Sequence, residues 1–184
     1  MKRYGQAIVV LLISMVFVTA CSGGSSTVPT PTPSPTPHPP AIGYLPEGWQ
    51  LDYEITYGQY STPGAPKTGS LKYIHEGNDA SIYIQYGDIP EWAEGKGYDA
   101  EGLLNEFFIQ GSSSCTGIYT PDEIGTMTFC DSPAAYANFS LPNESVYGIV
   151  VLCVKEPVII TVDAVWKTPE KGAEVMSIIG NVSY

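Results

Sequence analysis

The sequence contains very little histidine and almost no arginine. Among its 184 residues are two histidines, His38 and His75, and a single arginine, Arg3. Bidentate recognition of phosphate or carboxylate groups depends on arginine, and binding to nucleic acid depends on a basic surface. Because the formal net charge is −11, we expect no nucleic acid partner.

Catalytic and cofactor-binding motifs are also lacking. The chain contains no Gly-x-Ser-x-Gly, P-loop, Rossmann fingerprint, His-Glu-x-x-His, EF-hand loop or Cys-x-x-Cys. A Ser-His-Asp relay or a zinc site would have to be built around His75, because His38 lies in a proline-rich segment. We therefore favour a structural, hydrogen-bonded histidine at position 75, and we predict no catalytic residues and no resident cofactor.

Acidic residues are most dense between residues 88 and 106, where six carboxylates accompany one lysine. Asp88, Glu91 and Glu94 are candidate ligands for a hard cation such as Ca²⁺, which binds several carboxylate and carbonyl oxygens. Paired carboxylates also serve glycoside hydrolysis. The spacing matches no calcium-loop signature, so a solvated acidic surface is the favoured interpretation.

The first twenty residues have the layout of a signal peptide. Lys2 and Arg3 precede an apolar stretch from Ala7 to Val18, and small residues follow it. The stretch is shorter than the roughly 20 residues that cross a bilayer comfortably. We therefore expect residues 1–20 to be removed by cleavage, after which 6 basic and 19 acidic residues leave a formal net charge of −13.

The residues around the expected cleavage point are Val18-Thr19-Ala20-Cys21. They resemble the lipobox of bacterial and archaeal lipoproteins, in which the cysteine receives a diacylglycerol and becomes the new N-terminus. Two acyl chains anchor a protein stably. The resemblance implies a protein held by Cys21 on the extracytoplasmic face of the membrane, and ordinary secretory cleavage after Ala20 is the alternative.

Residues 21–41 are rich in serine, threonine and proline and contain no material for a core. Proline at alternate positions favours an extended, solvated polyproline II conformation. We interpret this segment as a stalk, and its serine and threonine residues could also carry O-linked sugar. The alternative is that it serves as a ligand for another domain.

Three cysteines follow Cys21, and an extracytoplasmic location permits disulfides. Cys115 lies in a Ser/Gly loop and Cys130 at the end of an expected strand, whereas Cys153 lies in an apolar run. We predict a Cys115–Cys130 disulfide, and Cys130 with Cys153 is the alternative pairing.

Two further sets of surface residues are predicted. Asparagine sequons that are candidates for glycosylation occur at Asn138, Asn143 and Asn181. Aromatic residues in or beside expected loops are candidates for an exposed contact patch. These aromatic residues are Tyr60, Trp92, Tyr98 and Tyr119.

Hydrophobic patterning between residues 42 and 184 predicts a single domain of seven strands and two helices. The first helix is capped by Asp99 and has an apolar face from Leu103 to Phe108. The second has Thr168 as its N-cap and Pro169 at its first position, and it ends near Ile179. The strands are expected at residues 49–57, 71–76, 80–86, 125–130, 134–141, 146–155 and 158–166.

The expected order is therefore βββαββββα, an α+β fold with one antiparallel sheet of six or seven strands. This order and the final Ile-Ile-Gly-Asn-Val-Ser-Tyr are similar to the PsbP/Mog1-like α+β sandwich. The opening Leu-Pro-Glu-Gly-Trp resembles extracytoplasmic domains of prokaryotic lipoproteins and anti-sigma-type membrane proteins. Both resemblances imply an arrangement of the domain, and neither implies an active site.

These observations together predict a non-enzymatic, lipid-anchored module that interacts with or assists a membrane complex at the cell surface. A protein that binds a small ligand or a divalent cation is the alternative, and a carboxylate-based hydrolase is the third interpretation.

Overall fold

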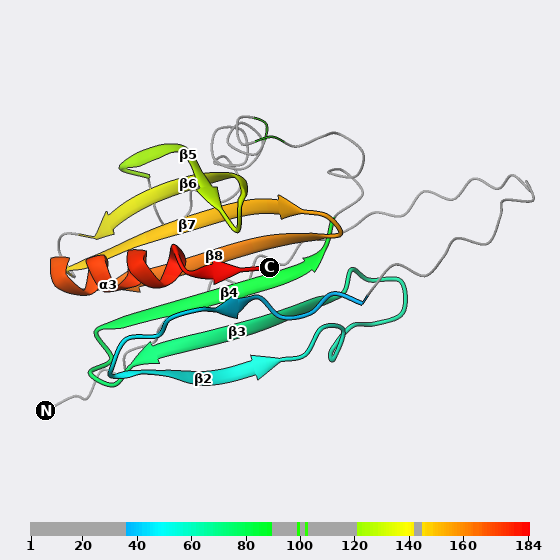
Figure 1. Cartoon of the computed structure of the whole chain (residues 1–184), viewed down its shortest axis with the longest axis horizontal. Coiled ribbons are helices and arrows are strands. Elements are labelled where there is room, and N and C mark those ends of the chain that lie inside the picture. Colours follow the sequence, from blue (N-terminus) through cyan, green and yellow to red (C-terminus); the bar gives the residue numbers. More distant parts are fainter. Residues whose placement is uncertain (1–35, 90–98, 100–101, 103–120, 142–144) are drawn as a thin grey trace, which may run out of the picture. The chain divides into compact units, whose positions relative to one another are not determined.

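The computed structural model describes residues 36–89, 99, 102, 121–141 and 145–184. Seven strands form one sheet in the order β2-β3-β4-β8-β7-β6-β5, and every neighbouring pair is antiparallel (Figure 1). The strands are β2 (Trp49–Ile55), β3 (Thr68–His75), β4 (Ala80–Asp88), β5 (Glu123–Phe129), β6 (Ser132–Leu141), β7 (Val146–Lys155) and β8 (Val158–Trp166). The predicted seven-stranded antiparallel sheet is confirmed.

The helix α3 (Pro169–Ile179) begins and ends where its sequence signals predict. Thr168 is the N-cap and accepts a hydrogen bond from the Lys171 amide, while Pro169 occupies the first turn, where no intrahelical donor is needed. The helix packs on β4 and β8. Val175, Ile178 and Ile179 are fully buried against the core.

The helix predicted to begin at Asp99 lies mostly outside the described residues. Gly102 is helical, and its amide donates to Asp99 Oδ1 over 2.8 Å, which is the contact expected of an N-cap. The predicted two-helix composition is thus matched in part, since the described chain is mostly sheet with one complete helix. No helix within the described ranges is long and apolar enough to cross a membrane.

A second, two-stranded sheet was not predicted. β1 (Ala41–Ile42) pairs antiparallel with β9 (Val182–Ser183), and the His38 ring stacks on Tyr184 at a centroid distance of 4.6 Å. Pro40 is buried. The last residues of the expected stalk therefore pack beside the C-terminus.

The core lies on one face of the large sheet, here called the helix face. The alternating residues Ile82, Ile84, Val151, Ile160 and Val162 point to this face and are fully buried. Figure 1 shows α3 and the β1–β9 pair in front of the sheet on this side. One helix is about 10 Å wide, whereas seven strands extend over about 30 Å, so α3 covers only part of the helix face.

The regular alternation of side chains between the two faces is interrupted in β2. A β-bulge between Leu51 and Tyr53 shifts the register, so that Trp49 pairs with His75 on the helix face and Tyr53 pairs with Lys72 on the opposite face. Leu51 is 47% exposed. Leu51 and Tyr53, which are two positions apart, therefore lie on opposite faces of the sheet.

Candidate functional site

The two flanks of α3 meet two different sets of side chains. At about 100° per residue, Lys171 and Glu174 lie on one side of the buried face and Met176 lies on the other. A polar cluster forms on the first flank, and an apolar groove lies beside the second.

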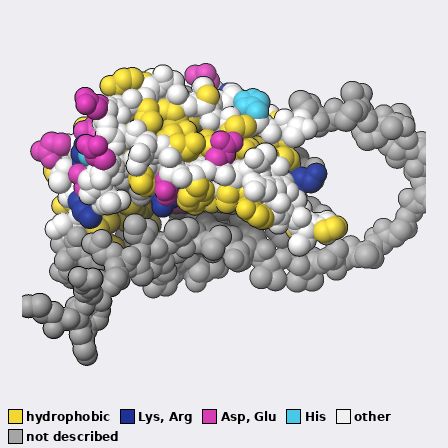
Figure 2. Space-filling view, turned by 90° about the horizontal axis from the view of Figure 1, so that it is seen from below, with side chains coloured by type: hydrophobic (Ala, Val, Ile, Leu, Met, Phe, Trp, Pro, Cys, Tyr) yellow, Lys and Arg dark blue, Asp and Glu magenta, His cyan; other side chains and the backbone are white. Residues whose placement is uncertain are grey.

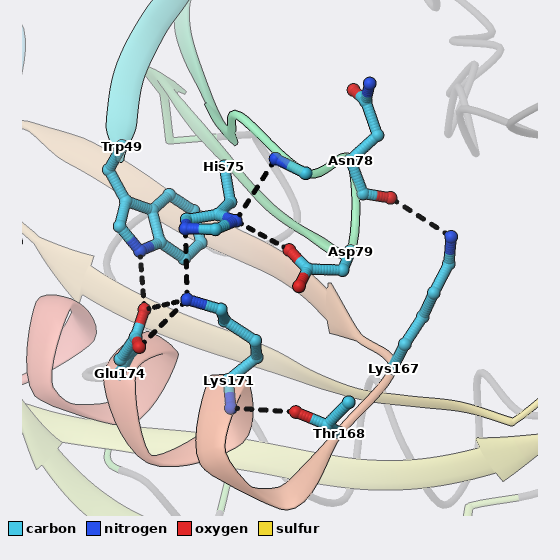
Figure 3. A network of polar contacts seen from close by, with 9 residues as sticks. Trp49, His75, Asn78, Asp79, Lys167, Thr168, Lys171 and Glu174 are labelled. Atoms are coloured by element: carbon cyan, nitrogen blue, oxygen red, sulfur yellow. Dashed lines mark hydrogen bonds and ion pairs between the residues drawn. The ribbon is translucent and has the colours of Figure 1, made fainter. Parts of the chain in front are cut away.

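The polar cluster, which we call the α3 clamp, consists of Trp49, His75, Asp79, Lys171 and Glu174 (Figure 3). Lys171 Nζ lies 2.9 Å from both Glu174 carboxylate oxygens and 3.0 Å from His75 Nε2. Trp49 Nε1 donates to Glu174 Oε2 over 3.1 Å. The clamp thus connects the first turns of α3 to the first residue of β2 and the last residue of β3.

The protonation pattern of His75 follows from its neighbours. His75 Nδ1 lies 2.7 Å from Asp79 Oδ1 and 3.3 Å from the Gly77 amide nitrogen. One tautomer cannot satisfy both contacts, because an ionised carboxylate only accepts and an amide N–H only donates, and the shorter contact with Asp79 favours the proton on Nδ1. Nε2 then accepts from the Lys171 ammonium. Both ring nitrogens are engaged, so His75 is hydrogen-bonded as predicted.

The Leu-Pro-Glu-Gly-Trp segment completes the clamp. Gly48 has a φ of +83°, and a Cβ at this position would lie 2.7 Å from His75 Nε2. The segment turns back so that the Trp49 amide donates to the Pro46 carbonyl, and Trp49 is only 7% exposed. Glycine at position 48 is therefore required by the turn and by the histidine beneath it.

The apolar groove lies on the helix face, between the Met176 flank of α3 and strands β5, β6 and β7. Its volume is about 440 Å³ and it opens to solvent. Aromatic and sulfur-containing side chains dominate its lining. The lining residues are Asp122, Met127, Tyr136, Asn138, Phe139, Tyr147, Gly148, Ile149, Trp166 and Met176.

Two glycines position aromatic rings of the groove. A Cβ on Gly172 of α3 would lie 2.6 Å from Trp166 Nε1, so the indole packs directly against the helix backbone. Across the β5–β6 pair, a Cβ on Gly125 would lie 2.9 Å from the ring of Tyr136. Tyr147 and Met176 remain 40% and 39% exposed at the rim.

A carboxylate marks the polar edge of the groove on β5. Tyr136 Oη donates to Glu123 Oε1 over 3.0 Å, and Asn138 Nδ2 donates to Glu123 Oε2 over 3.1 Å. The hydrogen bond to Glu123 raises the pKa of the Tyr136 phenol, because it favours the protonated form. Asp122 lies beside this pair and is exposed.

Among the predicted cation ligands, Asp88 lies at the end of β4 and already has two partners. Tyr57 Oη donates to Asp88 Oδ1, and the Lys67 amide donates to Oδ2 over 2.8 Å. Burial and this hydrogen bond raise the pKa of Tyr57. Glu91 and Glu94 lie outside the described residues, within which no group of three acidic, histidine or cysteine side chains is placed to hold a metal.

The cysteines of the sheet carry free thiols. Cys130 Sγ points into the core, 3.6 Å from the Val182 carbonyl, and Cys153 Sγ lies 3.6 Å from the Phe129 carbonyl. Neither the Cys115–Cys130 bridge nor the Cys130–Cys153 alternative is formed at these two residues, while Cys115 and the lipidation residue Cys21 lie outside the described ranges. Burial raises the pKa of Cys130 to about 12 and that of Cys153 to about 11.

Of the other predicted surface residues, Tyr60, Asn138 and Asn181 lie within the described part of the chain. Tyr60 is 75% exposed, whereas Trp92, Tyr98, Tyr119 and Asn143 lie outside the described residues. Asn138 is held by Glu123, and Asn181 Nδ2 donates to the Ser177 carbonyl. Figure 2 shows hydrophobic side chains across the middle of the face seen from below, with charged ones most dense at one end and others scattered over the face.

Comparison with known proteins adds a likeness of fold. No family model matches the chain, and no curated protein matches it. The chain is similar in structure to cyanobacterial PsbP (CyanoP) from Synechocystis sp. PCC 6803, known from a solution structure. The two share 10% sequence identity with a TM-score of 0.46, over 76% of this chain and 84% of the other.

The groove was missed from the sequence. Tyr136, Tyr147 and Trp166 stand at strand positions, and their alternation predicts burial in the core. One feature of the sequence could have indicated the groove. The strands β5 to β8 carry more aromatic and methionine residues than an eleven-residue helix can cover.

Proposed function

We propose that the protein is a non-enzymatic binding module that is displayed on the extracytoplasmic face of a prokaryotic membrane and uses the apolar groove to contact a membrane protein. Cys21 would carry the lipid, and residues 22–40 would form the stalk. The domain would then act as an accessory module of the complex that it contacts.

The groove is the observation that carries the proposal. Its rim exposes Tyr147 and Met176, while Ile149 in its floor is 2% exposed. Large apolar side chains in an open concavity lose contact with water when a partner covers them, which favours association. Tyrosine, tryptophan and methionine are also the residues enriched at protein interfaces.

The α3 clamp supports a binding role over a catalytic one. Its histidine, lysine and carboxylates satisfy one another, and the clamp fixes the helix that forms one wall of the groove. A rigid wall lowers the entropy lost on binding.

Site-specific photo-cross-linking in native membranes tests the proposal. A photoreactive phenylalanine analogue replaces Tyr147 in the groove or, as the comparison position, the 75% exposed Tyr60. We expect one defined membrane protein to cross-link at position 147 and not at position 60. In a Cys21→Ser chain, which would lack the lipid, the product is expected to fall strongly.

Three results would contradict parts of the proposal. Absence of a defined product at position 147 would rule out the groove as the contact surface. A product at position 60 alone would instead place the contact near the loop that follows β2. Unchanged cross-linking by the Cys21→Ser chain would show that the lipid anchor is not needed for the contact.

A further inference from the structure

We infer that the groove accepts a basic, apolar segment of a partner polypeptide, in which a lysine or arginine lies next to a large apolar side chain. The inference rests on the proposed function and names the chemistry of the partner that the groove would bind.

The size and lining of the groove fit one or two large apolar side chains. A volume of about 440 Å³ lies within the usual range of binding pockets, which is about 300 to 1,000 Å³. Met127 and Met176 lie among its walls, and unbranched thioether side chains adapt to ligands of different shape. The apolar part of the segment would pack between Met176 and Ile149.

The charge of the groove is of one sign. Asp122 is in its lining and Glu123 lies at its edge, held by Tyr136 and Asn138. None of the lysines that the structure describes lines the groove. Lys72 pairs with Asp52, Lys155 donates to the Cys130 carbonyl, Lys167 donates to the Asn78 carbonyl, Lys171 belongs to the clamp, and Lys67 lies against Gly58.

The aromatic rings of the groove add to the preference for a cation. Tyr136, Tyr147 and Trp166 line it, and the faces of such rings attract ammonium and guanidinium groups. A basic side chain that lies along these rings would reach the carboxylate of Asp122 or Glu123 with its charged end. The groove thus offers apolar, aromatic and acidic contacts within one concavity.

Charge also distinguishes this occupant from two others. A second copy of this chain is strongly acidic, with a net charge of −11 for the full sequence, and would be repelled over most of its surface. An anionic membrane surface would be repelled by Asp122 and Glu123 in the same way. A basic polypeptide is the occupant that gains from both the shape and the charge.

Binding of two synthetic peptides tests the inference. The full mature chain, with its lipid, is placed in nanodiscs of zwitterionic phospholipid. Fluorescein-labelled peptides of equal length, one of leucine and lysine and one of leucine and glutamate, are titrated by fluorescence anisotropy. We expect the leucine–lysine peptide to bind at least about tenfold more tightly, with an affinity that falls as salt is raised.

Matched variants locate the binding. Tyr147→Ala with Met176→Ala is expected to weaken binding of the leucine–lysine peptide about tenfold. Tyr44→Ala with Leu51→Ala is the control, because these residues are 56% and 47% exposed elsewhere on the surface. Asp122→Asn with Glu123→Gln is expected to flatten the salt dependence, whereas Glu47→Gln leaves it unchanged.

Equal binding of the two peptides, or binding that the Tyr147 and Met176 substitutions do not weaken, would overturn the inference. In that case a cross-link from position 147 to a membrane protein would still support the proposed function. The absence of such a cross-link would overturn the proposed function whichever peptide binds.

Discussion

The indole of Trp166 lies against the backbone of Gly172, where a Cβ would come within 2.6 Å of Nε1 and 3.0 Å of Cε2. Glycine in the middle of a helix usually costs about 1 kcal/mol relative to alanine. At this position the contact with the indole requires it. The same contact places Trp166 at the floor of the groove and α3 at its wall.

Gly172→Ala is therefore expected to destabilise the fold, although alanine is the better helix former. The added methyl group must displace Trp166 or lift α3, which costs about 1–3 kcal/mol in the free energy of unfolding. Urea denaturation followed by tryptophan fluorescence measures the loss. The exposed neighbour gives the control, since Ala173→Gly is expected to cost about 1 kcal/mol from helix propensity alone. A more stable Gly172→Ala protein would contradict the packing.

The α3 clamp predicts coupled effects of Trp49 and Lys171. Lys171→Met leaves Glu174 and His75 without their shared donor, and we expect a loss of about 1–2 kcal/mol in the free energy of unfolding. Trp49→Phe removes one further hydrogen bond to Glu174. A double-mutant cycle is expected to give a non-additive result, because both substitutions act on the same carboxylate. Strict additivity would show that the two contacts are independent. Lys67→Met, outside the clamp, is expected to change the stability little.

Most of the fold was predictable because its signals are local. Thr168-Pro169-Glu170 carries its own cap and first turn, and α3 begins there. The short connections at residues 142–145 and 156–157 force neighbouring strands to pair, and β6, β7 and β8 lie in that order.

What escaped prediction depends on contacts between distant residues. β1 and β9 have two residues each, too few for any periodicity, and they form only because the two ends of the domain meet. The bulge at Asp52 changes the face of Tyr53 without changing the sequence pattern. The groove exists because α3 packs on β4 and β8 and leaves the next strands partly open, which strand patterns alone do not specify.

Asp163 gives the chain a pH dependence of opposite sign to that of an ion-paired carboxylate. It lies between Tyr83 and Val150 on the face opposite the helix, and burial raises its pKa from 3.8 to about 6. Between these values the folded protein holds the proton and the unfolded chain has released it. The free energy of unfolding therefore falls by about 2–3 kcal/mol as the pH rises from about 4 to 6.

Asp163→Asn is expected to remove this component. The variant should be more stable than the wild type at pH 7 and of similar stability near pH 4, as measured by urea denaturation across the range. The exposed Glu47→Gln should retain the wild-type slope. A wild-type stability that rises through this window, with no difference in Asp163→Asn, would place the carboxylate in a solvated setting.

The buried thiols of Cys130 and Cys153 predict slow alkylation of the native protein. An ordinary thiol, with a pKa near 9, reacts through its thiolate, whereas the raised pKa values of about 12 and 11 leave a far smaller thiolate fraction at pH 8. We expect iodoacetamide to label both residues only after unfolding in urea, with each site quantified by peptide mass spectrometry. Rapid labelling of native Cys130 would contradict its burial. A protein mass that does not change on treatment with reductant, as expected of free thiols at positions 130 and 153, would agree with it. Recovery of a Cys115–Cys130 disulfide-linked peptide from protein isolated without reductant would show that Cys130 turns out of the core, and β9 would then lose the contact between Cys130 Sγ and the Val182 carbonyl.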